Sequence, residues 1–161
     1  MPSLRMLVFS AIWLLLAAGL FFYFSGKLNL NTVEKLGITK QVVLERDPSG
    51  HYHAEAFING VKAIVLVDTG ATDVIISQKL ANKIGITSHI AIRTKTANGD
   101  SVGYMTRLES VKLGGIVATN VAAIIAPNLS GGDVLLGMSF LNQMDVRLYK
   151  GTMTIKQVDL P

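Results

Sequence analysis

Most of the chain alternates between apolar and polar residues over short stretches, which is the pattern of β-strands. Turn-forming residues, mainly glycine, asparagine and aspartate, separate these stretches. The predicted strands are residues 42–44, 52–58, 61–67, 74–76, 90–96, 101–108, 111–117 with a turn at 114–115, 121–125, 134–136, 146–149 and 152–156. Short helices are predicted at 78–84, after the N-cap Ser77, and at 139–143. This pattern predicts an all-β domain over residues 42–161, built as a closed barrel or a sandwich.

The N-terminal segment has a different pattern. Residues 7–24 form an apolar run that only Ser10 interrupts. As a helix the run would be about 27 Å long, close to the hydrocarbon thickness of a bilayer. A cleaved signal peptide is the alternative, but the small residues lie inside the run and bulky aromatic residues follow them. The pattern therefore favours residues 1–26 as a short tail and an uncleaved transmembrane signal anchor.

Residues 27–41 have no strong period and are interpreted as a stem between this anchor and the domain. The short basic tail before the run predicts that the N-terminus stays inside. Basic residues also follow the run, but large domains can translocate despite such charges. We therefore expect a single-pass membrane protein with an extracytoplasmic domain. Cleavage within the stem, which would release a soluble form, stays open.

The composition excludes several kinds of site. The 161 residues include 15 Lys and Arg, 11 Asp and Glu, three His and no Cys. Without cysteine there is no disulfide, iron–sulfur cluster or thiol nucleophile. The basic residues are scattered singly, whereas a nucleic-acid binder needs a clustered basic face. His51, His53 and Glu55 alternate and could ligate a metal, but a solvated strand face is the simpler interpretation. We therefore expect no metal, no cofactor and no nucleic-acid partner.

One ionisable residue stands in an unusual place. Asp68 ends the apolar strand 61–67 and is followed at once by Thr69 and Gly70. A carboxylate there must be satisfied by nearby donors or have a perturbed pKa. The Thr69 hydroxyl and the Gly70 N–H could both donate to it. The triplet is also ordinary turn chemistry, so alone it indicates no more than a candidate.

Three features in chain order make the sequence resemble the retropepsin-like aspartic proteases, over roughly residues 54–153. The first is the apolar strand that leads into Asp68, Thr69, Gly70 and Ala71. The second is a hairpin whose tip is similar to the family's flap, at Ala97, Asn98, Gly99 and Asp100. The third is similar to the hydrophobic strand that passes beside the catalytic loop, the psi-loop, at Leu135, Leu136 and Gly137. A membrane helix before the domain fits the single-domain bacterial members, and the domain would then lie on the periplasmic side of the inner membrane.

The resemblance implies an aspartic endopeptidase on a closed β-barrel with one or two short helices. Such enzymes need two carboxylates that share a proton and activate a water. The chain has one Asp-Thr-Gly and is too short for two lobes, so we expect an obligate homodimer with Asp68 from each copy. By resemblance, Thr69 would brace the two catalytic loops and the Gly70 backbone would contact the substrate. Residues 97–100 would close over an extended peptide, with hydrophobic residues flanking the cut.

Two positions depart from the retroviral pattern. Thr72 stands where retroviral members carry Asp, and Met138 stands where they carry Arg. Those two residues normally form an ion pair that supports the dimer, so here the dimer must be held in another way. A catalytically silent peptide-binding or dimerisation module and a purely structural barrel remain alternatives. A serine nucleophile at Ser139 is disfavoured, because Leu141 stands where the second glycine of that motif belongs.

Overall fold

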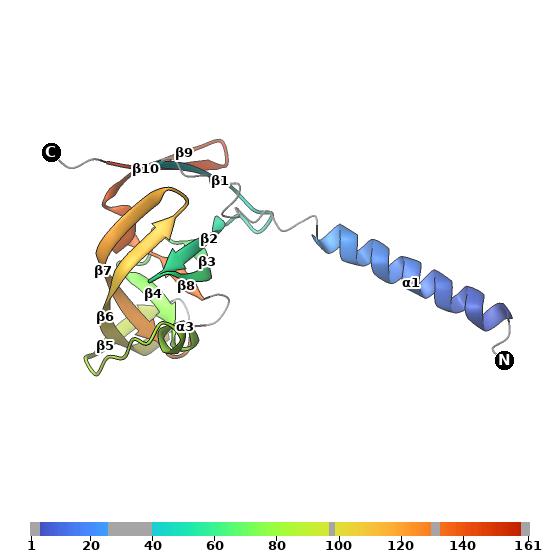
Figure 1. Cartoon of the computed structure of the whole chain (residues 1–161), viewed down its shortest axis with the longest axis horizontal. Helices are drawn as coiled ribbons and strands as arrows, with labels where there is room; N and C mark the ends of the chain where they lie inside the picture. Colours follow the sequence, from blue (N-terminus) through green and yellow to red (C-terminus); the bar gives the residue numbers. More distant parts are fainter. Residues whose placement is uncertain (1–3, 26–39, 97–98, 130–132, 159–161) are drawn as a thin grey trace.

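A computed structural model describes residues 4–25, 40–96, 99–129 and 133–158. Helix α1 (Leu4–Ser25) comes first and stands apart from the β-domain in Figure 1. The strands are β1 (Gln41–Glu45), β2 (His53–Ile58), β3 (Val61–Val67), β4 (Val74–Ser77), β5 (Ala91–Thr96), β6 (Gly99–Leu113), β7 (Ile116–Ala126), β8 (Val134–Leu136), β9 (Met144–Tyr149) and β10 (Thr152–Gln157). The short helices of the domain are α3 (Gln78–Lys83) and α4 (Met138–Leu141). Residues 27–39 of the predicted stem (27–41) lie outside the described residues, and its last residue, Gln41, is the first residue of β1.

Six strands close into a barrel (Figure 1). They follow the order β2-β3-β8-β4-β7-β6, and a further pairing of β6 with β2 completes the cylinder. Strand β5 pairs with β6 and extends this sheet as a hairpin. Strands β1, β10 and β9 form a separate three-stranded antiparallel sheet. The predicted mostly-β fold with a closed barrel and few short helices is therefore confirmed.

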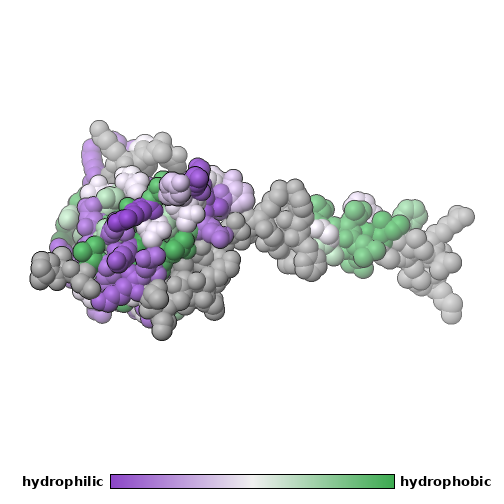
Figure 2. Space-filling view, turned by 90° about the horizontal axis from the view of Figure 1, so that it is seen from above, coloured by the Kyte–Doolittle hydropathy of each residue, from purple (hydrophilic) through white to green (hydrophobic). Residues whose placement is uncertain are grey.

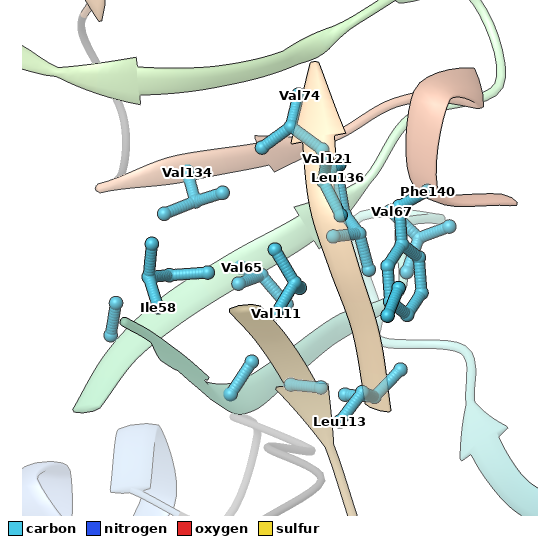
Figure 3. Close-up of a cluster of buried hydrophobic side chains, with 14 of the residues drawn as sticks. Ile58, Val65, Val67, Val74, Val111, Leu113, Val121, Val134, Leu136 and Phe140 are labelled. Carbon is cyan, nitrogen blue, oxygen red and sulfur yellow. The ribbon is translucent and has the colours of Figure 1, made fainter. Parts of the chain in front are cut away.

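Alternate residues of the strands fill the interior of the barrel. Figure 3 draws Val67, Leu136 and Phe140 among the buried side chains of this core. Full burial of a side chain of this size stabilises the fold by about 2 kcal/mol. Residues 63–67 are all apolar, a pattern that predicts burial on both faces, but only the inner face of β3 is buried, and Ile64 and Leu66 are half-buried. The single layer of the barrel wall accounts for this difference, since one face of each strand turns away from the core.

Two strands are longer than the sequence predicts. Strand β6 continues to Leu113 and β7 begins at Ile116, so one long hairpin replaces the shorter strands expected between residues 101 and 125. The two strands keep one register from Tyr104 opposite Ile125 to Leu113 opposite Ile116. Three polar residues between the predicted strands, Glu109, Thr119 and Asn120, are exposed within this hairpin, and Asn120 has a φ of 54°.

Within the described residues, no helix is both long enough and apolar enough to cross a membrane. Side chains of α1 are described for Met6, Phe9 and residues 12–20, and all of these are exposed. Figure 2 shows apolar residues gathered on this helix. The transmembrane helix expected at residues 7–24 stays a prediction.

Candidate active site

Asp68 lies where β3 ends and a tight loop begins. Its backbone N–H donates to Leu136 O at 3.2 Å, and its carbonyl accepts from the Ala71 N–H at 3.3 Å. The Gly70 N–H donates to Asp68 Oδ1 at 2.8 Å. The Asp68 side chain is partly exposed, and Thr69 and Gly70 beside it are exposed. The loop therefore presents one carboxylate, supported by a backbone donor, at the surface of the monomer.

Strand β8 lies directly beside this loop. It runs parallel to β3, with Leu136 opposite Val67, and antiparallel to β4, with Leu135 opposite Ile75. Gly137 follows and packs against the backbone of the loop. A Cβ added to Gly137 would lie 2.2 Å from Asp73 O and 2.7 Å from Ala71 O, so only glycine fits there. The structure thus brings the predicted psi-loop residues and the Asp68 loop together.

Helix α4 is tied to the same loop by its first residues. The Met138 N–H donates to Ala71 O at 2.8 Å, and the Ser139 N–H donates to Thr72 O at 2.9 Å. Ser139 Oγ accepts from the Val74 N–H at 2.9 Å and donates to Ala122 O at 2.7 Å. Its hydroxyl is therefore engaged in joining α4, β4 and β7, which argues against a nucleophile. Sequence reasoning missed this supporting role, because no local signal relates position 139 to positions 74 and 122.

The flap-like hairpin has a shorter tip than the sequence predicts. Gly99 and Asp100 were assigned to the tip, but both belong to β6, opposite Thr96 and Lys95 of β5. Gly99 has a φ of 107°, which glycine adopts without strain. Two residues separate the end of β5 at Thr96 from the start of β6 at Gly99. Ala97 and Asn98 lie outside the described residues.

A cavity of about 420 Å³ lies against this hairpin. Its wall is formed by β5, β6 and the loop that follows β7, and it is lined by Arg93, Asp100, Ser101, Val102, Tyr104, Pro127 and Asn128. Sequence reasoning selected Asp100 as a flap residue and missed the others. The cavity joins two segments far apart in the chain, and a strand pattern does not show which distant loop a strand will meet.

A second group of polar residues, in and after the turn between β1 and β2, forms hydrogen bonds and ion pairs within the group. Asp47 accepts from Ser49 Oγ at 2.6 Å and from the His51 N–H at 2.9 Å, and it pairs with His53 Nδ1 at 2.7 Å. Burial opposes ionisation, but these bonds and the attraction of His53 outweigh it and hold the pKa of Asp47 well below its usual range. Glu55 pairs with Lys62 at 2.9 Å. On the alternating face at residues 51–55, His53 contacts Asp47 and Glu55 forms an ion pair with Lys62. The described residues contain no cluster suited to a metal.

Comparison with known proteins places this loop in a family. Residues 54–143 match the family described as "gag-polyprotein putative aspartyl protease". An uncharacterised protein from a Sinorhizobium species is 31% identical over 110 residues, which cover 66% of this chain and 47% of that protein. An uncharacterised protein from Rickettsia prowazekii is 31% identical over 106 residues, which cover 64% of this chain and 45% of that protein. The chain thus spans about half the length of these curated relatives.

A solved structure shares the fold. The crystal structure of a retropepsin-like aspartic protease from Rickettsia conorii is similar with a TM-score of 0.64 and 29% identity, covering 73% of this chain and 90% of that one. The family match spans more than half of the chain and includes the Asp68 loop, the flap-like hairpin and β8. The chain therefore belongs to the retropepsin-like aspartyl protease family.

Proposed function

We propose that this protein is an aspartic endopeptidase that hydrolyses peptide bonds as a homodimer, with one Asp68 from each copy. The observation that carries the proposal is the Asp68 carboxylate itself. It lies at the end of a buried strand and is partly exposed, and its Oδ1 accepts a hydrogen bond from the Gly70 N–H at 2.8 Å. Retropepsin-like proteases work as dimers that act on peptide substrates. The exposed side of Asp68 is where a second carboxylate could approach.

The reaction follows from two carboxyl groups about 3 Å apart that share one proton. The ionised carboxylate takes a proton from water as the water oxygen attacks the carbonyl carbon of the peptide. The other carboxyl group gives its proton to the carbonyl oxygen, which leaves a neutral diol on that carbon. The carboxyl group that now carries the proton gives it to the peptide nitrogen, and the other carboxylate takes a proton from one hydroxyl of the diol. The carbon–nitrogen bond then breaks, and a carboxylic acid and an amine are released. The two Asp68 groups end with one shared proton, as they began.

The catalytic pair also explains why a second copy is needed. The sequence contains one Asp-Thr-Gly, so one chain supplies one such carboxylate. Thr69 and Gly70, which follow Asp68, are exposed, so both are free to contact a partner copy in the proposed dimer. A two-fold axis beside Asp68 would bring the same loop of the partner opposite, because residues meet their own copies on such an axis.

Dilution tests the need for two copies. We expect the full-length protein in detergent to cleave members of a mixed peptide library, with an activity per mole of protein that falls as the protein is diluted. The reason is that dilution separates the two carboxylates. Cleavage is followed by mass spectrometry, and assembly is followed by analytical ultracentrifugation in the same buffer. Constant activity per mole in a range where the protein is monomeric would contradict the proposal.

One observation weakens the case for a stable catalytic dimer, and so keeps open the alternative of a catalytically silent peptide-binding or dimerisation module. Positions 72 and 138 carry Thr and Met, so the ion pair that supports retroviral dimers is absent here. The same experiment separates the two functions. A protein that is dimeric and retains peptides of the library without cutting them would be a binding module.

We further propose that residues 7–24 anchor the protein in a bacterial inner membrane, with the protease domain on the periplasmic side. The apolar run at these residues supports this, and so does the exposure of the described α1 side chains. Two copies confined to one membrane also meet at a higher effective concentration. The anchor would thereby favour the dimer.

Fractionation tests the anchor. We expect full-length protein to stay with membranes after alkaline carbonate extraction, and protease added to spheroplasts to degrade the domain. A chain that begins at residue 26 is the matched control and should be recovered in the soluble fraction. Full-length protein in the soluble fraction, or a mature N-terminus beyond residue 24, would contradict the proposal.

A further inference from the structure

We propose that the cavity beneath the β5–β6 hairpin is a specificity pocket for an acidic side chain of the peptide substrate, and that Arg93 is the residue that selects it. This inference rests on the proposed endopeptidase function. It adds to the expectation drawn from the family resemblance, in which hydrophobic residues flank the cut.

The hairpin turns Arg93 toward the side on which the barrel interior lies. Arg93 is opposite Val102, and residues opposite each other on antiparallel strands share one face. Val102, Tyr104 and Leu108 lie on the same face of β6, because even numbers of residues separate them. Leu108 is wholly buried in the core, whereas Val102 and Arg93 lie beyond it and are exposed. The cavity wall that contains Arg93, Val102 and Tyr104 therefore continues the inner surface of the barrel beyond its rim.

The cavity lies within reach of a peptide held at Asp68. Ser77, at the end of β4, is opposite Ala126, the residue before Pro127 in the cavity wall. Asp68 lies at the other end of β4, because its N–H bonds to Leu136 while Leu135 is opposite Ile75. The length of β4 is about 10 Å at roughly 3.3 Å per residue. A side chain three or four residues from the cut in an extended substrate would then reach the cavity.

The chemistry of the wall favours a carboxylate. Arg93 takes part in none of the charged contacts His53–Asp47, Lys62–Glu55 and Arg147–Asp145 of the described residues. A guanidinium at the edge of a partly enclosed cavity binds a carboxylate through two parallel hydrogen bonds. Val102, Tyr104 and Pro127 offer apolar contact for the methylene groups of a glutamate. The cavity wall therefore complements a glutamate side chain, with its carboxylate at Arg93 and its methylene groups against the apolar residues.

Asp100 lines the same cavity and restricts the preference to one substrate position. It is opposite Lys95, two residue pairs nearer the hairpin tip than Arg93 and Val102. Two residues of a strand span about 7 Å, so the negative and positive groups of the wall face different side chains of the substrate. An acidic side chain next to Asp100 would be repelled. We therefore expect acid to be favoured at the position facing Arg93 and disfavoured two residues away, toward the tip.

Peptide pairs that differ only by Glu or Gln test the pocket on the full-length protein. The pairs are built on a peptide cleaved in the library, with the exchange made in turn at each position within four residues of the cut. At one such position on either side, we expect kcat/KM to be about tenfold higher for Glu at low ionic strength, and the ratio to shrink as salt is added. Equal kcat/KM for Glu and Gln at every position would overturn the assignment.

Substitutions then identify the residue. Arg93→Gln should remove the preference for Glu, and Arg93→Glu should replace it with a preference for Lys. Arg107→Gln is the matched control, because Arg107 lies on the opposite face of β6 and its Nη1 donates to Asn120 O at 2.8 Å. This control should keep the preference. A preference that survives in folded Arg93→Gln protein, with an unchanged melting temperature, would overturn the role of Arg93.

A binding measurement separates failure of the pocket from failure of the proposed function. The probe is a fluorescent peptide pair, Glu or Gln, with a reduced amide at the bond to be cut, followed by anisotropy. No cleavage together with tighter, Arg93-dependent binding of the Glu peptide would refute the protease function and support the pocket. Cleavage with no Glu preference in either assay would refute the pocket alone. Neither cleavage nor a binding preference would refute both.

Discussion

Replacement of Asp68 by asparagine should abolish peptide cleavage and leave the fold unchanged. The amide has nearly the size of the carboxylate, and its oxygen can still accept from the Gly70 N–H, now 2.8 Å from Oδ1. It can neither take a proton from water nor share one with a partner carboxylate. Removal of such an acid–base group lowers the rate by a factor on the order of 10³ or more. The measurement is kcat/KM for a cleaved peptide, beside a circular dichroism spectrum and a melting curve.

Mixing makes this prediction specific to a shared site. When Asp68→Asn protein is added in ninefold excess, only about a tenth of the wild-type chains would pair with another wild-type chain. Activity should fall accordingly after the copies exchange. Asp145→Asn is the control, since Asp145 lies on β9 and pairs with Arg147 at 2.9 Å. Cleavage by Asp68→Asn alone, or activity that the excess does not reduce, would refute the shared pair of aspartates.

Features set by neighbouring residues were predictable from the sequence. A turn was expected between the strands 52–58 and 61–67, and its residues, Asn59 and Gly60, have φ of 46° and 79°. Ser77 was expected to cap the helix that follows, and its hydroxyl accepts from the Leu80 N–H at 3.2 Å. Each signal depends on a few adjacent residues whose conformational preferences act locally. The position of Asp68 at the end of an apolar strand was visible for the same reason.

Features set by distant pairing were not predictable in the same way. The alternating pattern shows which face of a strand is buried, but not which strand lies beside it. Strand β1 pairs with β10, with Gln41 opposite Lys156, and nothing in either segment identifies the other. For the same reason, the sequence did not predict the hydrogen bonds by which Ser139 joins α4 to β4 and β7. Nor did it predict the cavity that Arg93 and Pro127 both line. Only the resemblance to a family connected the glycine at position 137 with the Asp68 loop.

Gly137→Ala should have the largest effect on stability of any single methyl added near the site. Gly137 has a φ of −88°, which alanine adopts freely, so the backbone conformation is not the obstacle. The obstacle is space, since the new methyl would lie 2.2 Å from Asp73 O and 2.7 Å from Ala71 O. Both are backbone atoms of the loop that carries Asp68. Extra groups in a packed interior destabilise by about 1–3 kcal/mol, and we expect the upper end or more here because no side chain can move aside.

Gly70→Ala is the matched control for Gly137→Ala. Its added methyl would meet only Asp68 Oδ1, at 3.1 Å, a side-chain atom that can shift. Urea unfolding followed by circular dichroism should therefore show a loss of about 3 kcal/mol for Gly137→Ala and less than about 1 kcal/mol for Gly70→Ala. Peptide cleavage should fall in both, because the first displaces the whole loop and the second displaces the carboxylate itself. Equal stabilities of Gly137→Ala and wild type would mean that the loop can move away from β8, and the position of Asp68 would then have to be set by the partner copy.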